Sequence, residues 1–204
     1  MMLSEKDATL YYKLRDELFI FSIDIFFTKK MKKLHDKTVD FPIMMNSFAH
    51  KIFNKNNRHI LDTFVRMNPS TLPEEELAIV RSWKNFIHGN FLLFEQQQDF
   101  AIFLRLQDNG AIPYGVRGLT ESILDVCRKA DLKLPTVVNT ILLPFKGTII
   151  YHGLLGFGDQ FSDPTRIDLQ KFFSERISGK SVITSLEPGF APEKLSNEQI
   201  WREY

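Results

Sequence analysis

The hydrophobic period of the sequence changes near Gly89, and this change constrains the fold more than any other feature. Before Gly89, apolar residues recur every three or four positions, which is the spacing of a helix that buries one face. After Gly89, apolar and aromatic residues fill runs of strand length that are separated by turn residues. The sequence therefore predicts an α+β protein, in which N-terminal helices precede a five- to six-stranded antiparallel meander or small barrel with one or two packed helices.

The helical region is predicted to cover residues 1–88. Ser4 can cap a first helix from about Glu5 to His35, which is apolar nearly all round apart from Asp24. A helix of this kind is typical of the centre of a bundle or of a dimer interface. Three shorter helices are expected after it: one that starts at Pro42 and buries Phe48 and Ile52, one that buries Ile60, Leu61, Phe64 and Val65, and one from a Thr71–Glu74 capping box that buries Leu77, Val80, Trp83 and Ile87.

The β unit is predicted to cover residues 89–186, and a tail with a short helix follows over 187–204. The expected strands are Asn90–Gln97, Phe100–Gln107, Ala111–Leu119, Thr136–Leu143 and Thr148–Leu155, with Ser181–Leu186 as a sixth candidate. A helix capped by Thr120 is expected to end at Ala130. Another begins at Asp163-Pro164 and is expected to bury Leu169, Phe172, Phe173 and Ile177 before it ends at Gly179.

The composition is that of a globular protein without a strong overall charge. The chain has 204 residues, 44% hydrophobic residues, nineteen phenylalanines and a net charge of +1. The phenylalanines favour a thick aromatic core over a stacking surface. Between residues 29 and 58 the charge is uneven, because eight basic residues face only Asp36 and Asp40; they are Lys29, Lys30, Lys32, Lys33, Lys37, Lys51, Lys55 and Arg58. A solvated helix end explains this cluster more simply than contact with a polyanion.

The sequence favours a cytoplasmic location without a membrane partner. The most apolar segment, Leu18–Phe27, is too short to span a bilayer as a helix. The first residues carry acids where a secretory signal would carry basic residues. Cys127 is the single cysteine, so an intramolecular disulfide and a cysteine-rich zinc site are excluded, and its apolar surroundings predict a buried thiol.

No recognisable catalytic or cofactor motif is present in the sequence. None of the five histidines has a metal-ligand spacing, and there is no G-x-S-x-G nucleophile elbow. The glycines at 153, 156 and 158 match neither phosphate-loop pattern, so they indicate a flexible exit from a hairpin. We therefore predict no cofactor, no metal site and no catalytic residue.

Two small groups of polar and aromatic residues remain as candidate binding residues. Trp83 and Lys84 close the last predicted helix before the strands. Arg117, Lys146, Tyr151 and His152 lie on or beside three different strands. Such side chains on a small barrel can bind a peptide or a nucleic-acid backbone, although Tyr151 can equally anchor at the rim of the core.

Three segments resemble the landmarks of a family of uncharacterised bacterial proteins. They are Glu75–Lys84, Tyr114–Leu119 and Leu142–Leu155, and the last contains the hairpin sequence LPFKGTIIYHGLL. The resemblance covers roughly Pro69 to Leu186. Some members carry a zinc-binding tail rich in Cys and His, which this chain lacks, and members often have Asp at the position of His152. The resemblance implies the order of helices, hairpin and helix, and it implies no activity.

We expect a non-enzymatic protein-interaction or oligomerisation module, whose partner is a second copy bound through the first helix or another protein. Two alternatives stay open. One is a nucleic-acid-binding protein that uses the basic cluster 29–58 and the strand aromatics, with binding that weakens steeply in salt. The other is a hydrolase whose active site gathers residues from distant segments. The sequence identifies neither a ligand nor a reaction.

Overall fold

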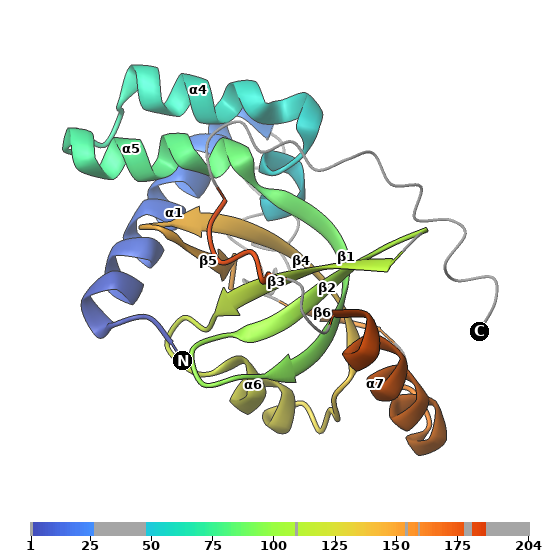
Figure 1. Ribbon diagram of the computed structural model, residues 1–204. Helices are drawn as coiled ribbons and strands as arrows, with labels where there is room; N and C mark the ends of the chain where they lie inside the picture. The colour runs from blue at the N-terminus through green and yellow to red at the C-terminus, as the bar shows by residue number, and fades with distance from the viewer. Residues whose placement is uncertain are drawn as a thin grey trace, which may run out of the picture.

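The computed structural model describes residues 2–26, 48–108, 110–153, 155–158, 160–177 and 181–186, with side chains from Asp24 to Phe26 left out. It has an α+β fold in which a β-barrel carries helices on two of its outer sides (Figure 1). The helices α1 (Glu5–Phe26), α4 (Arg58–Met67) and α5 (Glu74–Ser82) form one layer. The helix α7 (Asp163–Ile177) lies alone on another side. The structure therefore confirms the predicted α+β class, with helices before the strands.

The α1 layer is held by large aromatic side chains that lie completely inside the protein. Trp83, on the short 3-10 helix η2 (Trp83–Asn85), has no exposed surface, and its ring lies 5.9 Å from that of Tyr11 on α1. The ring of Tyr11 in turn lies 6.0 Å from that of Phe145 on the barrel. Tilted aromatic contacts at these distances are favourable, so they join the helices to the sheet. This packing confirms that the abundant phenylalanines build a core.

The apolar residues of α1 are largely covered by the same chain. Leu14 and Leu18 are fully buried, Phe19 is 3% exposed, and Ile20 is the one large apolar residue of the described helix that is well exposed, at 63%. The stripe therefore has a partner within the fold, in the helical turn at residues 48–52 and in α4. The predicted continuation of this helix to His35 and the start of the next helix at Pro42 lie outside the described residues.

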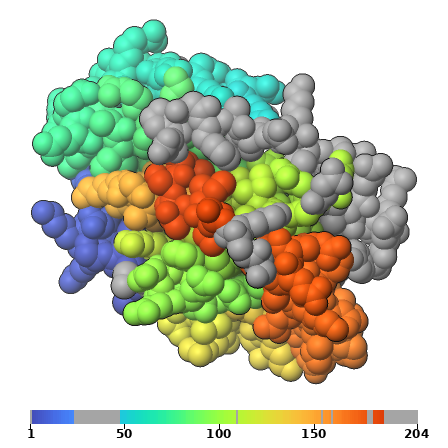
Figure 2. Space-filling view, viewed as in Figure 1, coloured from blue at the N-terminus to red at the C-terminus, as the bar shows by residue number. Residues whose placement is uncertain are grey.

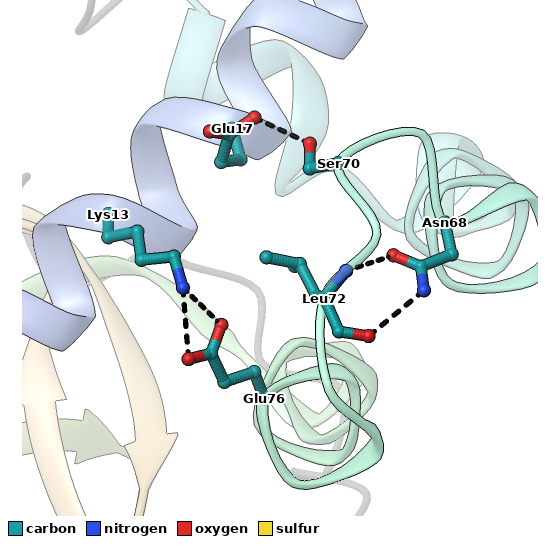
Figure 3. A network of polar contacts seen from close by, with 6 residues as sticks. All are labelled: Lys13, Glu17, Asn68, Ser70, Leu72 and Glu76. Carbon is teal, nitrogen blue, oxygen red and sulfur yellow. Dashed lines mark hydrogen bonds and ion pairs between the residues drawn. The ribbon is translucent and has the colours of Figure 1, made fainter.

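A network of polar contacts joins α1 to the loop between α4 and α5 (Figure 3). Lys13 forms an ion pair with Glu76, with 2.7 Å between Nζ and Oε2, and the Ser70 hydroxyl donates to Glu17 at 2.5 Å. The Asn68 side chain accepts from the Leu72 N–H at 2.7 Å and donates to the Leu72 carbonyl at 3.0 Å. These contacts fix the loop that reverses the chain.

The predicted capping box before α5 is wrong. Pro73 occupies the N-cap position and makes no side-chain cap, while Thr71 has a left-handed backbone with φ of 50°. Asn68 takes over the local hydrogen bonding of this loop, because its amide can satisfy both the N–H and the carbonyl of Leu72. The helix also ends earlier than predicted, since Ile87 already belongs to the first strand.

Five strands close into a barrel. They are β1 (Ile87–Gln96), β2 (Ala101–Gln107), β3 (Gly110–Arg117), β4 (Thr136–Phe145) and β5 (Thr148–Tyr151), and the neighbours run β1-β2-β3-β5-β4. The first half of β1 pairs with β4 from Ile87 to Leu93, and its second half pairs with β2 from Leu92 to Gln96, which closes the ring. The pair β3–β5 is parallel and the others in the ring are antiparallel.

This connectivity, with the short helix α6 (Ile123–Lys129) between β3 and β4, is that of the OB fold, a five-stranded Greek-key barrel. The barrel interior is aromatic: the ring of Phe91 lies 6.0 Å from that of Phe103 and 6.3 Å from that of Tyr114. The sequence left a meander and a small barrel as alternatives, and the structure shows the barrel. The N-cap of α6 is Ser122, two residues after the predicted Thr120.

The helix α7 packs on the outer face of β1, β2 and β3. Its buried residues Leu169 and Phe173 contact an apolar patch on these strands that includes Leu92, Phe94 and Leu104. Phe172, which the sequence predicted to be buried, is 40% exposed and lies at the surface beside the buried Phe173. The chain then returns at 181–186, where Ile183 pairs with the edge of β3, and this segment lies at the surface in Figure 2. The sixth predicted strand is thus a single bridge.

A short strand, β6 (Gly156–Phe157), pairs with β4 beyond the end of β5.

In the part of the chain that the structure describes, no helix is both long enough and apolar enough to cross a membrane.

Candidate functional site

A large hollow lies between α7 and the outer face of the barrel, and it has a volume of about 1130 Å³. One wall is α7. The floor is formed by the strands β1 and β4, and the other rim by β6 and by the turn between β2 and β3. A groove of this size, beside a structured helix, is the first place to look for a bound ligand.

The groove combines an apolar floor with amide side chains. Leu92, Val137 and Leu169 supply apolar surface. The Asn139 amide donates to the Asn90 side-chain oxygen at 2.7 Å, so these two side chains on neighbouring strands hold each other in place. Further polar and aromatic side chains line the rim: Gln107, Gln160, Ser162, Thr165, Phe157, Phe161 and Phe172.

The charges in the lining nearly cancel. Its charged side chains are Asp108 and Arg176. The guanidinium carbon of Arg176 lies 3.4 Å from the centre of the Phe172 ring, so the cation covers an aromatic face. A lining of this kind attracts neither a polyanion nor a polycation by long-range charge.

The strand β6 borders the groove with a backbone edge that has no partner among the described residues. The Gly158 N–H donates to the Val137 carbonyl at 3.0 Å, and Gly156 pairs with Asn139. In an antiparallel ladder the residue between two such positions turns its N–H and C=O the other way. Phe157 therefore presents both backbone groups away from β4, and its side chain is 38% exposed.

Three of the residues that the sequence singled out are buried and apart from this groove. Trp83 is in the centre of the α1 layer, and Tyr151 is 5% exposed. Burial raises the pKa of the Tyr151 hydroxyl, so it stays protonated. His152 is 3% exposed, and among the described residues neither of its ring nitrogens has a hydrogen-bond partner. Burial lowers the pKa of His152 to about 3, helped by the nearby His50 and Arg15.

The other three candidate residues lie at separate surface positions. Lys84 forms an ion pair with Asp62 at 2.7 Å. Lys146 lies in the turn between β4 and β5 and forms an ion pair with Asp7 on α1 at 2.5 Å, and this ion pair holds the pKa of the Asp7 carboxyl below its usual value. Arg117 ends β3 beside Ile150 of β5. The structure thus brings Tyr151, His152 and Arg117 onto adjacent strands, but it does not gather the six residues into one site.

Two histidines that lie 38 positions apart in sequence, His50 and His88, are in direct contact. His50 Nδ1 lies 2.9 Å from His88 Nε2. Burial lowers the pKa of both imidazoles, and for His88 the neighbouring His50 lowers it further. Within the described ranges there is no group of three or more His, Cys, Asp or Glu that could hold a metal ion. Cys127 is buried as predicted, and burial raises the pKa of its thiol to about 11.

The comparisons with known proteins give no similarity to set beside this geometry: no family model, no curated protein and no solved structure matches the chain. The resemblance to the bacterial family through the hairpin around Lys146 therefore stays a prediction.

The groove could not be found from motifs. Its amides, Asn90 and Asn139, are 49 residues apart and meet only because β1 pairs with β4. One local signal was present, since the glycines around Phe157 leave room for a short strand close to β4: a Cβ at Gly156 would lie 3.4 Å from the Asn139 carbonyl oxygen.

Proposed function

We propose that this protein is a non-enzymatic protein-interaction module that binds an extended peptide segment in the groove between α7 and the barrel. The observation that carries the proposal is the outward backbone edge of Phe157 at the rim of a groove with an apolar floor. An extended peptide can add to this free edge of β6 through main-chain hydrogen bonds, and the peptide residues that flank this contact can place side chains over the floor.

The lining supports a peptide over a charged polymer. The apolar floor at Leu92, Val137 and Leu169 suits aliphatic side chains of a ligand. The amides of Asn90 and Asn139 can donate to and accept from peptide groups at the same position. The proposal includes a cytoplasmic location, for which the lone buried thiol of Cys127 is the support.

Three other expectations receive less support. The apolar stripe of α1 packs within its own chain, so a homodimer through this helix is not needed to cover it. Nucleic acids bind OB folds on the face of strands 2 and 3, and here α7 covers that face at Leu104 and Ala111. A hydrolase would need a set of converging titratable groups, and among the described lining residues Asp108 is the single acid and there is no histidine.

Selection from a random-peptide display library tests the proposal, followed by affinity measurement on the purified chain. We expect peptides with aliphatic residues at alternate positions and a Kd on the order of micromolar, as for other single-strand additions. Addition of such a peptide should shift the NMR signals of 155–158 and α7. Failure to select any peptide, or binding of neutral oligosaccharides at the same residues, would overturn the proposal.

The variant Phe157→Pro tests the backbone edge directly. Proline removes the N–H that faces away from β4 and leaves the β4 ladder intact, so we expect peptide affinity to fall about ten-fold or more. The matched variant Phe157→Leu keeps the N–H and should bind within about three-fold of the wild type. If Phe157→Pro unfolds, Phe172→Ser on the opposite wall decides, because its side chain is exposed and its loss should weaken only the peptide.

A further inference from the structure

A second, smaller hollow lies at the start of β1 and has a volume of about 370 Å³. It is enclosed by the 3-10 helix η1 (Lys55–Asn57), the start of α4 and the first residues of β1. Asn54 caps η1, since its side chain accepts from the Asn56 N–H at 3.0 Å. The wall that η1 forms is therefore structured.

Among the described residues that line this hollow, three are cations and none is an acid. The cations are Lys55, Arg58 and Arg105, which come from three separate elements. Across the described part of the chain, none of the three has an ion pair within 4.0 Å, whereas the nearby Lys84 is neutralised by Asp62. Cations gathered without counter-charges repel one another, and a bound anion relieves that repulsion.

Arg105 shows the imbalance most clearly. It lies two residues after Phe103 on β2, so it points to the same side as Phe103, toward the barrel interior. Its Nη1 atom is buried and meets no acceptor in good hydrogen-bond geometry among the described residues, and its neighbour is the uncharged hydroxyl of Tyr114. A buried guanidinium beside a neutral hydroxyl lacks a counter-charge, so an anion would be a stronger partner.

Arg58 is held in an orientation suited to an anion. Its guanidinium carbon lies 5.4 Å from the centre of the Phe86 ring, which lines the same hollow. Stacking on an aromatic ring leaves the in-plane N–H groups of arginine free to donate in pairs to a planar or tetrahedral oxyanion. His88 adds a neutral imidazole to the lining, because burial and His50 lower its pKa.

We propose that this hollow is a binding site for a small phosphate-bearing ligand, whose phosphate oxygens accept from Arg58 and Arg105 and lie beside the ammonium of Lys55. The volume admits a phosphomonoester with a compact organic part against Phe86. A nucleic-acid strand would need a row of cations along a groove, whereas these three cations line a single small hollow. The site is independent of the peptide groove, with which it shares no lining residue.

The test is titration of the full chain with inorganic pyrophosphate and with adenosine monophosphate, followed by calorimetry and by thermal unfolding. We expect saturable binding at one site and a rise in Tm, because a ligand that binds only the folded state stabilises it. Adenosine without phosphate should not bind. Absence of binding at concentrations up to about 10 mM would overturn the proposal, since a Kd above that range corresponds to under about 3 kcal/mol.

Substitutions of the lining residues test whether the ligand binds in this hollow. Arg58→Gln and Lys55→Met should each weaken pyrophosphate about ten-fold or more, because each removes a charge-assisted contact. Lys171→Met on α7 is the matched control and should bind as the wild type does, since Lys171 is exposed and outside the hollow. Arg105→Met should abolish binding; if it fails to fold, the first two variants decide. Unchanged affinity in them, or binding of single-stranded oligonucleotides but not of pyrophosphate, contradicts the proposal.

Discussion

The two helical layers on the barrel differ in how completely they bury their aromatic residues. In the α1 layer, Trp83, Tyr11 and Phe64 have no exposed surface. In the α7 layer, Phe173 is 6% exposed, and Phe172 and Ile167 are 40% and 67% exposed. Stability within a protein is uneven, and elements with few buried contacts open first. The comparison indicates that the α1 layer contributes more to the stability of the fold, whereas α7 is the layer that opens at the lower free-energy cost.

Removal of an aromatic ring from the α1 layer should have the largest effect on stability. We expect Phe64→Ala to lower the free energy of unfolding by about 3–5 kcal/mol, because the ring is fully buried and its loss leaves a cavity. Urea denaturation measures this loss. Ile20→Ala on α1 is the control and should change stability by less than about 0.5 kcal/mol, since that side chain is 63% exposed. Equal losses of unfolding free energy in the two variants would contradict the conclusion that the α1 layer buries its aromatic residues within its own chain.

The same kind of change in the α7 layer should have a smaller and more local effect. We expect Phe173→Ala to cost about 2 kcal/mol, below the usual range for a central phenylalanine, because Phe173 packs in the smaller of the two apolar clusters and next to the exposed Phe172. Hydrogen exchange should then speed up in α7 while the β1–β4 ladder keeps its protection. The neighbouring Phe172→Ala serves as its comparison and should leave exchange unchanged. Faster exchange throughout the barrel would erase the distinction between the two layers.

The smallest effect at neutral pH is expected at His152, where it should depend on acidity. Replacement by leucine removes two buried nitrogens without partners, so we expect a gain of about 1 kcal/mol at pH 7. The pKa of His152 falls from 6.5 in the unfolded chain to about 3 in the folded one. Between these values the unfolded chain binds the extra proton, so the wild type loses stability as the pH falls, by about 1.4 kcal/mol per pH unit.

Denaturation curves of the wild type and of His152→Leu between pH 4 and pH 8 measure this dependence. The difference between the two proteins should widen below about pH 6.5 and stay constant above it. Parallel curves over the whole range would show that His152 gains a hydrogen-bond partner in solution. The outcome also bears on the comparison of the two layers, because it shows whether water reaches the buried side chains on the α1 side of the barrel.

Much of the architecture could be predicted from local patterns. Hydrophobic spacing and turn or cap residues predict the strands and the helices at Ile60–Val65 and Asp163–Ile177. The predicted bounds agree with the structure within a few residues. Local patterns could not predict that the strands close into a barrel. The pairing of β1 with β4 joins Ile87 to Leu142, and no turn connects them in sequence, so a meander and a barrel looked alike.

The sites escaped prediction for the same reason. Arg105 and Arg58 sit 47 positions apart, and neither belongs to a motif; the fold brings them together at the start of β1. The basic cluster at residues 29–58 did point to Lys55 and Arg58, but it gave no hint of Arg105. Conversely, Trp83 and Tyr151 were candidate binding residues, and both lie in the core, which agrees with the buried helix face predicted for Trp83 and with the alternative of a core anchor for Tyr151.

The division of β1 between two partners has a consequence for how the chain acquires its fold. The hairpins β2–β3 and β4–β5 need only short loops, so they can form early. The first half of β1 must wait for β4, about 50 positions later, and such distant pairing slows folding. During synthesis, the apolar residues around Phe91 therefore stay without their neighbour until β4 has left the ribosome, which makes this half-built sheet the point at which chaperones should be needed most.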